Sequence, residues 1–294
     1  MVDDRSLRLG VLLTAASAVA YSTAGFFTRL IPLDAWTILF WRGVFGGLLL
    51  AAWIVWQERR ATVEAFRTIG ALGLACAACS TLATICFINA LQRTSVADVT
   101  VIFATAPFAT AALAWLWTGE RQARGTLLAS LVALLGVALT VDAARSQGRL
   151  LGDVLALGMT LLMATMMVIV RASRSRSMLP ASCLSAFALA VVVAPLAHTS
   201  LPGDINALYL VLFGTTQFGL GLLLLTTGTR LISATLSALI NNLEVPLAPA
   251  WVWLAFGETP SPAVWGGGAL IVAAILGDLM LRRQPLRERA ACPG

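Results

Sequence analysis

The chain contains no lysine, only one histidine and few charged side chains of any kind. Charged residues make up 12% of its 294 residues, whereas hydrophobic residues make up 59%. A water-soluble fold of this composition would leave a large apolar surface in contact with water. The mean hydropathy of +0.87 therefore indicates a protein whose surface is covered by a lipid bilayer.

The same shortages argue against an enzyme. An intramembrane enzyme needs a Ser/His pair, paired Asp residues or a His-rich metal site. The chain has one His, no Gly-x-Ser-x-Gly motif and no pair of mid-span Asp residues. Cys76 and Cys79 lack a second pair of ligands, so packing explains them better than metal binding. We expect no catalytic site, no metal and no cofactor.

Long apolar runs dominate the rest of the sequence and predict an all-α membrane protein. A transmembrane helix needs roughly 20 mostly apolar residues, and the chain offers ten runs of about that length. The expected spans are 9–28, 35–56, 69–91, 96–117, 126–142, 152–170, 181–200, 208–228, 233–256 and 264–281.

The arginines predict the orientation of these spans. All 20 basic residues are Arg. With the spans placed as above, 15 of them fall on the side of the N-terminus and four on the other side. Such an excess favours cytoplasmic N- and C-termini. The net charge of +6 then reflects membrane topology and not a surface that binds nucleic acid.

An internal repeat divides the chain. The segment from Ser95 to Glu120 aligns without a gap on the segment from Ser233 to Glu258, at an offset of 138. Both segments close on Gly-Glu, and the flanking residues match as well. The chain is therefore interpreted as a duplicated membrane protein.

Each half holds five expected spans, so the second half enters the membrane from the opposite side. The predicted fold is ten transmembrane helices in two inverted five-helix repeats. The repeats would cover residues 1–142 and 152–284, joined by an external linker over 143–151 and followed by a cytoplasmic tail over 285–294. Folds of this kind bind substrate near the bilayer midplane, where the repeats meet, and work by alternating access.

Two charged residues inside the spans are the first candidates for the site, because a charge within a bilayer is costly and is retained for a reason. Glu244 falls near the centre of its span. Ser237, Asn241 and Glu244 are spaced to share one helical face, which would line the pathway or only bind neighbouring helices. Arg42 would bind a substrate carboxylate or pair with a neighbouring helix, and its distance from the midplane favours the second role.

The remaining candidates are polar, aromatic or methionine side chains near the middle of a span. Those expected to line a cavity with Asn241 and Glu244 are Tyr21, Ser80, Thr81, Thr84, Phe103, Met163, Gln217 and Phe218. Those expected to act in structure or gating with Arg42 are Pro107, Pro246, Gly119, Glu120, Gly257 and Glu258.

The repeated segments carry a resemblance to a known family. The run from Pro107 through Trp115 to Glu120, and its counterpart from Glu244 through Trp253 to Glu258, are similar to the EamA repeat of the drug/metabolite transporter superfamily. The family's proline, which follows the acid directly, stands one residue later here, at Pro246. The resemblance implies a ten-helix inverted-repeat bundle in a bacterial inner membrane that moves amino acids, metabolites or drugs out of the cell. The sequence further resembles the aromatic amino-acid exporter branch.

The expected function is export of amino acids, with aromatic or bulky apolar side chains, through a central cavity. Its partners would be a small-molecule substrate and the lipid bilayer, with no nucleic acid, and Glu244 would carry the proton if transport is proton-coupled. Efflux of cationic drugs is the alternative, since Glu244 could supply the counter-charge. Phosphorylated substrates are disfavoured, because Arg42 is the only basic residue within a span. An intramembrane enzyme is a remote alternative.

Overall fold

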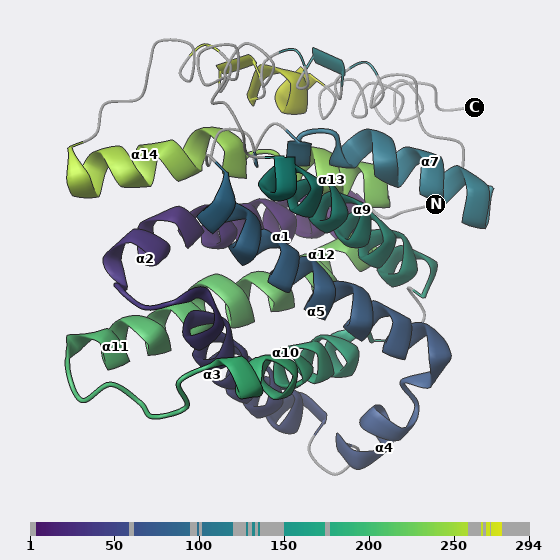
Figure 1. Ribbon diagram of the computed structural model, residues 1–294. Helices are drawn as coiled ribbons and strands as arrows, with labels where there is room; N and C mark the ends of the chain where they lie inside the picture. The colour runs from purple at the N-terminus through teal and green to yellow at the C-terminus, as the bar shows by residue number, and fades with distance from the viewer. Residues whose placement is uncertain are drawn as a thin grey trace, which may run out of the picture.

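The computed structural model describes residues 4–58, 62–94, 99, 102–119, 128, 131–132, 135, 150–173, 177–257, 266, 269–270 and 272–277, and its ordered elements are all helical (Figure 1). The first half contains α1 (Asp4–Ser22), α2 (Ala24–Leu30), α3 (Ala35–Glu58), α4 (Thr62–Arg67), α5 (Gly70–Arg93) and α7 (Ala106–Thr118). The second half contains α9 (Leu150–Ala172), α10 (Leu179–Val193), the 3₁₀ turn η2 (Ala194–Leu196), α11 (Ile205–Leu212), the π-helix η3 (Phe213–Leu220), α12 (Gly221–Leu231), α13 (Ala234–Asn241) and α14 (Glu244–Phe256).

Six helical stretches within the described residues are long and apolar enough to cross a bilayer. Each overlaps one of the expected spans, which confirms those six. Two further expected spans, 126–142 and 264–281, lie mostly outside the described residues, so the total of ten stays a prediction. The six stretches are Arg5–Leu30, Ala35–Gln57, Gly70–Arg93, Leu150–Ala172, Leu179–Leu196 and Ile205–Leu231.

The expected spans 96–117 and 233–256 are each interrupted by a turn. Within 233–256, α13 ends at Asn241 and α14 begins at Glu244, with a turn at 242–243 between them. Within 96–117, a turn at 104–105 precedes α7. A proline in the first turn of each new helix gives the physical reason. Pro107 and Pro246 have no backbone N–H to donate to the residue four positions earlier, so neither helix can run through unbroken.

The same local structure occurs twice at the offset of 138. α7 and α14 each contain 13 residues, and both end on a glycine in the left-handed conformation, Gly119 at φ 66° and Gly257 at φ 70°. Glycine adopts this conformation without steric cost, which is why it ends helices. Glu120 and Glu258, which follow these glycines, lie outside the described residues.

Helices from the two halves pack against each other in matching pairs. The most extensive contacts join α5 to α9, α3 to α10 and α1 to α12. At an offset of 138, α9 corresponds to α1 and α12 to α5, so the α5–α9 pair is the counterpart of the α1–α12 pair. The halves are therefore interleaved, and Figure 1 shows α1, α12, α5 and α9 side by side in the middle of the bundle.

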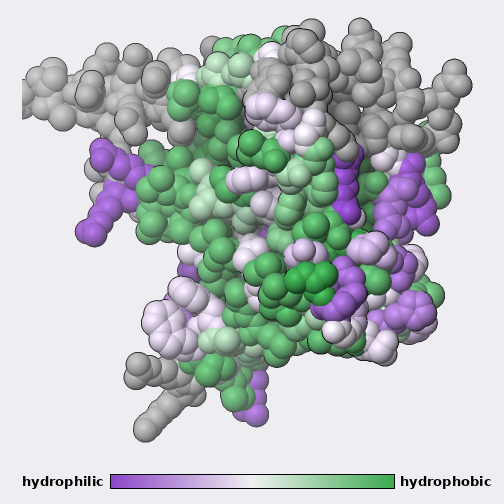
Figure 2. Space-filling view, turned by 90° about the vertical axis from the view of Figure 1, so that its left-hand side faces the viewer, coloured by the Kyte–Doolittle hydropathy of each residue, from purple (hydrophilic) through white to green (hydrophobic). Residues whose placement is uncertain are grey.

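The surface of the bundle is apolar where a soluble protein would be polar. Leu12, Trp56, Leu116 and Val191 are all more than 65% exposed, at 67%, 66%, 73% and 72%. Figure 2 shows hydrophobic side chains over the middle of one face and hydrophilic ones toward its two sides. An apolar band between polar margins is what a bilayer requires of a protein that spans it. The chain is a multi-pass membrane protein.

Glycines allow α3 and η3 to approach each other closely. A Cβ atom added at Gly214 would lie 2.6 Å from Cβ of Phe45 and 3.2 Å from the carbonyl oxygen of Arg42. A Cβ added at Gly46 would lie 2.7 Å from Cδ1 of Phe218. Small residues at a helix contact permit such backbone proximity within a membrane. The contact places Arg42 of α3 directly beside η3.

The Gly214→Ala substitution should destabilise the protein, because the new Cβ cannot fit without moving α3 away from η3. Overpacking of this kind costs about 1–3 kcal/mol, and thermal unfolding in detergent should show a midpoint several degrees below that of the wild type. Gly25→Ala is the matched control, since a Cβ added there meets nothing within 4 Å. Equal midpoints for the Gly214 variant and the wild type would contradict the proposed close packing.

Candidate functional site

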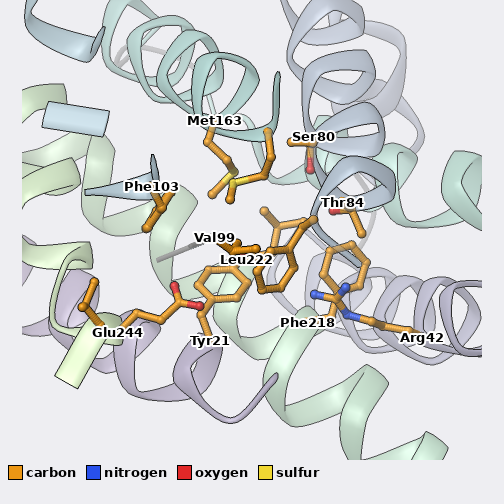
Figure 3. A pocket seen from close by; sticks show the side chains of 14 residues that line it. Tyr21, Arg42, Ser80, Thr84, Val99, Phe103, Met163, Phe218, Leu222 and Glu244 are labelled. Carbon is orange, nitrogen blue, oxygen red and sulfur yellow. The ribbon is translucent and has the colours of Figure 1, made fainter. Parts of the chain in front are cut away.

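A cavity lies between the two halves, at the level where several helices are interrupted (Figure 3). It holds about 630 Å³ of space not filled by protein atoms, part of which is open to the outside, and the centre of a water molecule can reach about 60 Å³. The cavity is thus narrow in this conformation. Its lining residues are Tyr21, Arg42, Ser80, Ala83, Thr84, Phe87, Val99, Phe103, Met159, Met163, Phe218, Leu222, Glu244 and Val245.

The interruptions of the helices explain the position of the cavity. Tyr21 lies just before the turn at Thr23 that separates α1 from α2, and Phe103 lies just before the turn at 104–105. Glu244 directly follows the turn at 242–243, and Phe218 belongs to the π-helix. Irregular backbone within a membrane is tolerated where it faces protein or an internal cavity. The four interruptions meet around one such cavity.

Glu244 enters the cavity from the first turn of α14. A carboxylate in this place is favoured by the N-terminal end of the helix dipole. Trp251, on the same helix, donates a hydrogen bond from Nε1 to Oγ of Ser22, at 2.8 Å. This bond holds α14 against the end of α1. The positions of Glu244 on α14 and Tyr21 on α1 are therefore fixed relative to each other.

Arg42 enters from the opposite side, and Tyr21 lies between it and Glu244 (Figure 3). The Arg42 side chain is only 2% exposed. Its Nε donates a hydrogen bond to Oε1 of Gln217 at 3.1 Å, and Nε2 of Gln217 donates in turn to the carbonyl oxygen of Tyr21 at 3.3 Å. The Gln217 amide therefore fixes the direction of the guanidinium.

Two phenylalanines from η3 complete the surroundings of Arg42. The guanidinium carbon lies 5.1 Å from the ring centroid of Phe213 and 4.5 Å from that of Phe218. Each contact is a cation–π interaction, worth about 0.5–2 kcal/mol. In an α-helix, residues five apart point about 140° away from each other. In a π-helix, hydrogen bonds run from residue i to i+5, so Phe213 and Phe218 can both face the same guanidinium.

The structure brings most of the predicted cavity residues together around one cavity. Arg42 joins them there, although the sequence favoured a position outside the site. The lining position does not by itself test substrate binding, so their role stays a prediction. Those that line the cavity are Tyr21, Ser80, Thr84, Phe103, Met163, Phe218 and Glu244.

Three predicted lining residues lie outside the cavity wall. Thr81 donates a hydrogen bond to the carbonyl oxygen of Ser185 at 3.0 Å, and Gln217 accepts one from Nε of Arg42. Asn241 is fully buried and accepts a hydrogen bond from Ser17 at 3.3 Å. These polar groups bind neighbouring helices.

The prediction that Ser237, Asn241 and Glu244 share one helical face was wrong. The helix that carries Ser237 and Asn241 ends before Glu244, so the three side chains do not share a helical face. Ser237 instead shares a hydrogen bond of 2.7 Å with Thr229 of α12. Because the helix breaks before Glu244, Glu244 lines the cavity and the other two residues do not.

Sequence reasoning missed the apolar part of the lining. Met159 lies one helical turn before Met163, and Phe87 lies three residues after Thr84, so helical spacing from the predicted residues would have found both. The same spacing would have indicated Ala83, Val99 and Leu222, which lie three residues after Ser80, four before Phe103 and four after Phe218. Val245 directly follows Glu244 and carries no signal of its own.

The cavity can bind a molecule but offers no chemistry for reaction. Its polar groups are one carboxyl, one guanidinium, two hydroxyls from Ser80 and Thr84, and the phenol of Tyr21. Within the described part of the chain, no group of three or more His, Cys, Asp and Glu side chains could hold a metal ion. The rest of the lining is apolar, as is typical of small-molecule binding sites.

Known proteins resemble this chain over almost its whole length. The family model described as the EamA-like transporter family matches residues 8–142 and again residues 150–279. The pseudopaline exporters CntI of two strains of Pseudomonas aeruginosa are 26% identical over 275 residues, which is 92% of this chain and 95% of theirs. One solved crystal structure shares the fold, with a TM-score of 0.79 at 17% identity, covering 92% of this chain and 97% of that one.

The Gln217→Leu substitution should destabilise the protein, because it leaves the buried Nε of Arg42 without an acceptor. An unsatisfied buried group costs about 1–3 kcal/mol, and more when it is charged. Gln217→Glu should keep most of the stability, since a carboxylate can accept the same hydrogen bond.

Thermal unfolding in lipid nanodiscs is the measurement, and Thr216→Val is the control. Thr216 belongs to the same π-helix but is exposed on its outer side, so its replacement should change the midpoint little. If the Leu variant unfolded at the wild-type temperature, Gln217 would not support Arg42 as described.

Proposed function

The chain belongs to the EamA-like transporter family, and on this basis we propose that it exports amino acids, with aromatic or bulky apolar side chains, and related metabolites from the bacterial cytoplasm. Family membership makes it a membrane transporter and not an enzyme. The proposal adds the substrate class, the direction of transport and the inner membrane as the location.

The lining of the cavity is the observation that carries the proposal. Phenylalanine and methionine side chains provide a deformable apolar surface that suits large apolar groups of varied shape. A few hydroxyls and one charge of each sign stand in the same wall. An amino acid with a large apolar side chain has the same combination of groups, an apolar body with one positive and one negative charge at one end.

The related exporters support the transport of small metabolites in general. Both are named for the export of pseudopaline, and they match this chain over nearly its full length. At 26% identity they support a common direction of transport more than a common substrate. We therefore take export from them, and the substrate class from the cavity of this chain.

Alternating access is the mechanism we propose. The two matches to the family model support two repeats, which we assign to residues 1–142 and 152–284 in opposite orientations, with both termini in the cytoplasm. A cavity enclosed by interleaved halves can open to either side when one set of helices rocks against the other.

Efflux of cationic drugs is the second candidate, because Glu244 supplies a carboxyl group within an apolar cavity. Arg42 weighs against it. A guanidinium in the same wall repels a cation, whereas it attracts the carboxylate of a zwitterion.

Uptake of radiolabelled tryptophan into liposomes that contain the purified protein tests the main proposal. We expect saturable uptake that unlabelled phenylalanine blocks, that threonine blocks more weakly and that ethidium leaves unchanged. Repeating the assay with and without a proton gradient shows whether transport is proton-coupled. Uptake of ethidium without uptake of tryptophan would replace the amino-acid proposal by the second candidate.

The Glu244→Gln substitution separates the two candidates further. If the substrate is a zwitterion held at both ends, loss of the carboxyl should weaken tryptophan transport about tenfold or more and should also remove any dependence on the proton gradient. Thr84→Val, a neutral change in the same wall, should affect tryptophan transport less than Glu244→Gln does. Unchanged tryptophan transport by the Gln variant would show that Glu244 contacts neither substrate nor proton.

A further inference from the structure

Arg42 is a buried cation that makes no hydrogen bond to an acidic side chain in the described part of the chain, and Glu244 acts on its charge only from across the cavity. It is 2% exposed, and the groups within reach are the neutral amide of Gln217 and two phenylalanine rings. These neighbours hold the side chain in place, but none of them cancels its charge. A buried charge that is not compensated is strongly unfavourable, and arginine stays protonated in proteins. An anion bound closer than Glu244 would therefore stabilise the guanidinium further.

One guanidinium nitrogen shows where that anion would lie. Nε is used by Gln217, whereas Nη1 is buried and has no hydrogen-bond acceptor among the described residues. Arg42 lines the cavity, and Figure 3 shows its guanidinium directed toward the middle of the cavity. The end of the planar fork that carries the two Nη atoms is thus directed toward the cavity, and Nη1 is covered by neighbouring groups in this conformation.

We infer that Arg42 binds the carboxylate of the exported molecule through this outer end of its guanidinium. The inference rests on the proposed function, since it names the part of the substrate that Arg42 recognises. A carboxylate matches the planar fork and forms short, charge-assisted hydrogen bonds with it. A phosphate dianion fits less well, because Arg42 is the only cation among the described residues of the lining and Glu244 stands across the cavity.

Glu244 gives the bound molecule its direction. With the carboxylate at Arg42, an α-amino group points toward the opposite side, where Glu244 reaches into the cavity (Figure 3). The side chain of the amino acid is then left to the apolar remainder of the wall, which includes Phe103, Met159 and Met163. The two charges select the head group, and the apolar wall accepts the variable part.

Gln217 acts as a positioning residue in this scheme. Its amide occupies the Nε edge of the guanidinium and is itself fixed by the backbone of Tyr21. A carboxylate therefore approaches only from the cavity. The π-helix makes this possible, because it brings Gln217 and both phenylalanines to the same side chain.

Binding of compounds with and without a carboxylate tests the inference. Isothermal titration of the purified wild-type protein should show that tryptophan binds about 10- to 100-fold more tightly than tryptophanamide and tryptamine, which lack the carboxylate. The ratio of the Kd of tryptophanamide to that of tryptophan is the decisive quantity, because the indole contacts cancel in it.

Variants of Arg42 should lower this ratio, because tryptophan loses its carboxylate contact while tryptophanamide, a cation, is no longer repelled by the guanidinium. In Arg42→Gln the ratio should fall to about 1, and Arg42→Lys should retain part of it. Arg93→Gln is the matched control, since it removes an exposed arginine at the end of α5 and should keep the wild-type ratio. The wild-type series and the Lys variant decide the question if the Gln variant does not fold.

The possible failures are distinct. If the wild type transports tryptophan but binds tryptophanamide equally well, the inference is overturned and the proposed function stands. The same holds if a folded Arg42→Gln variant keeps the wild-type ratio. If the wild type neither binds nor transports amino acids, the proposed function itself is wrong.

Discussion

The structure depends on one constraint, that a backbone inside a bilayer cannot leave its polar groups facing lipid. A helix within the membrane can therefore be interrupted only where the freed groups face protein or an internal cavity. In this chain the turns at Thr23, 104–105 and 242–243, and the π-helix η3, all surround the same cavity. The interruptions and the site are consequences of the same physical requirement.

The second requirement concerns charge. A guanidinium and a carboxyl are both placed at the level of the cavity, which is costly in an apolar environment. The protein meets part of this cost with neutral groups, since Gln217 accepts a hydrogen bond from Arg42 and the rings of Phe213 and Phe218 face its charge. It leaves one guanidinium nitrogen without an acceptor in the described residues. An anion that binds closer to the guanidinium than Glu244 would therefore stabilise it further.

The duplication connects these features. The α7 and α14 segments have the same length, the same preceding turn and the same terminal glycine conformation. They differ at the first residue of the helix. The residue that begins α14 is Glu244, which lines the cavity, whereas its counterpart in α7 is Ala106. Two copies of one local structure thus provide the symmetry of the bundle, while the difference between Ala106 and Glu244 contributes to the asymmetry of the site.

Composition and periodicity alone determined that the chain is helical, lies in a membrane and is built from two related halves, because these properties depend on the solvent and on local sequence. The sequence also identified Glu244 and Arg42, since a charge in an apolar run stands out without any structure. Only the tertiary structure decided which side chains meet. The break before Glu244 separated it from Ser237 and Asn241, and the π-helix turned Gln217 and two phenylalanines toward Arg42. These outcomes depend on contacts between residues as far apart as Arg42 and Gln217, whose positions along the chain do not indicate their proximity in the fold.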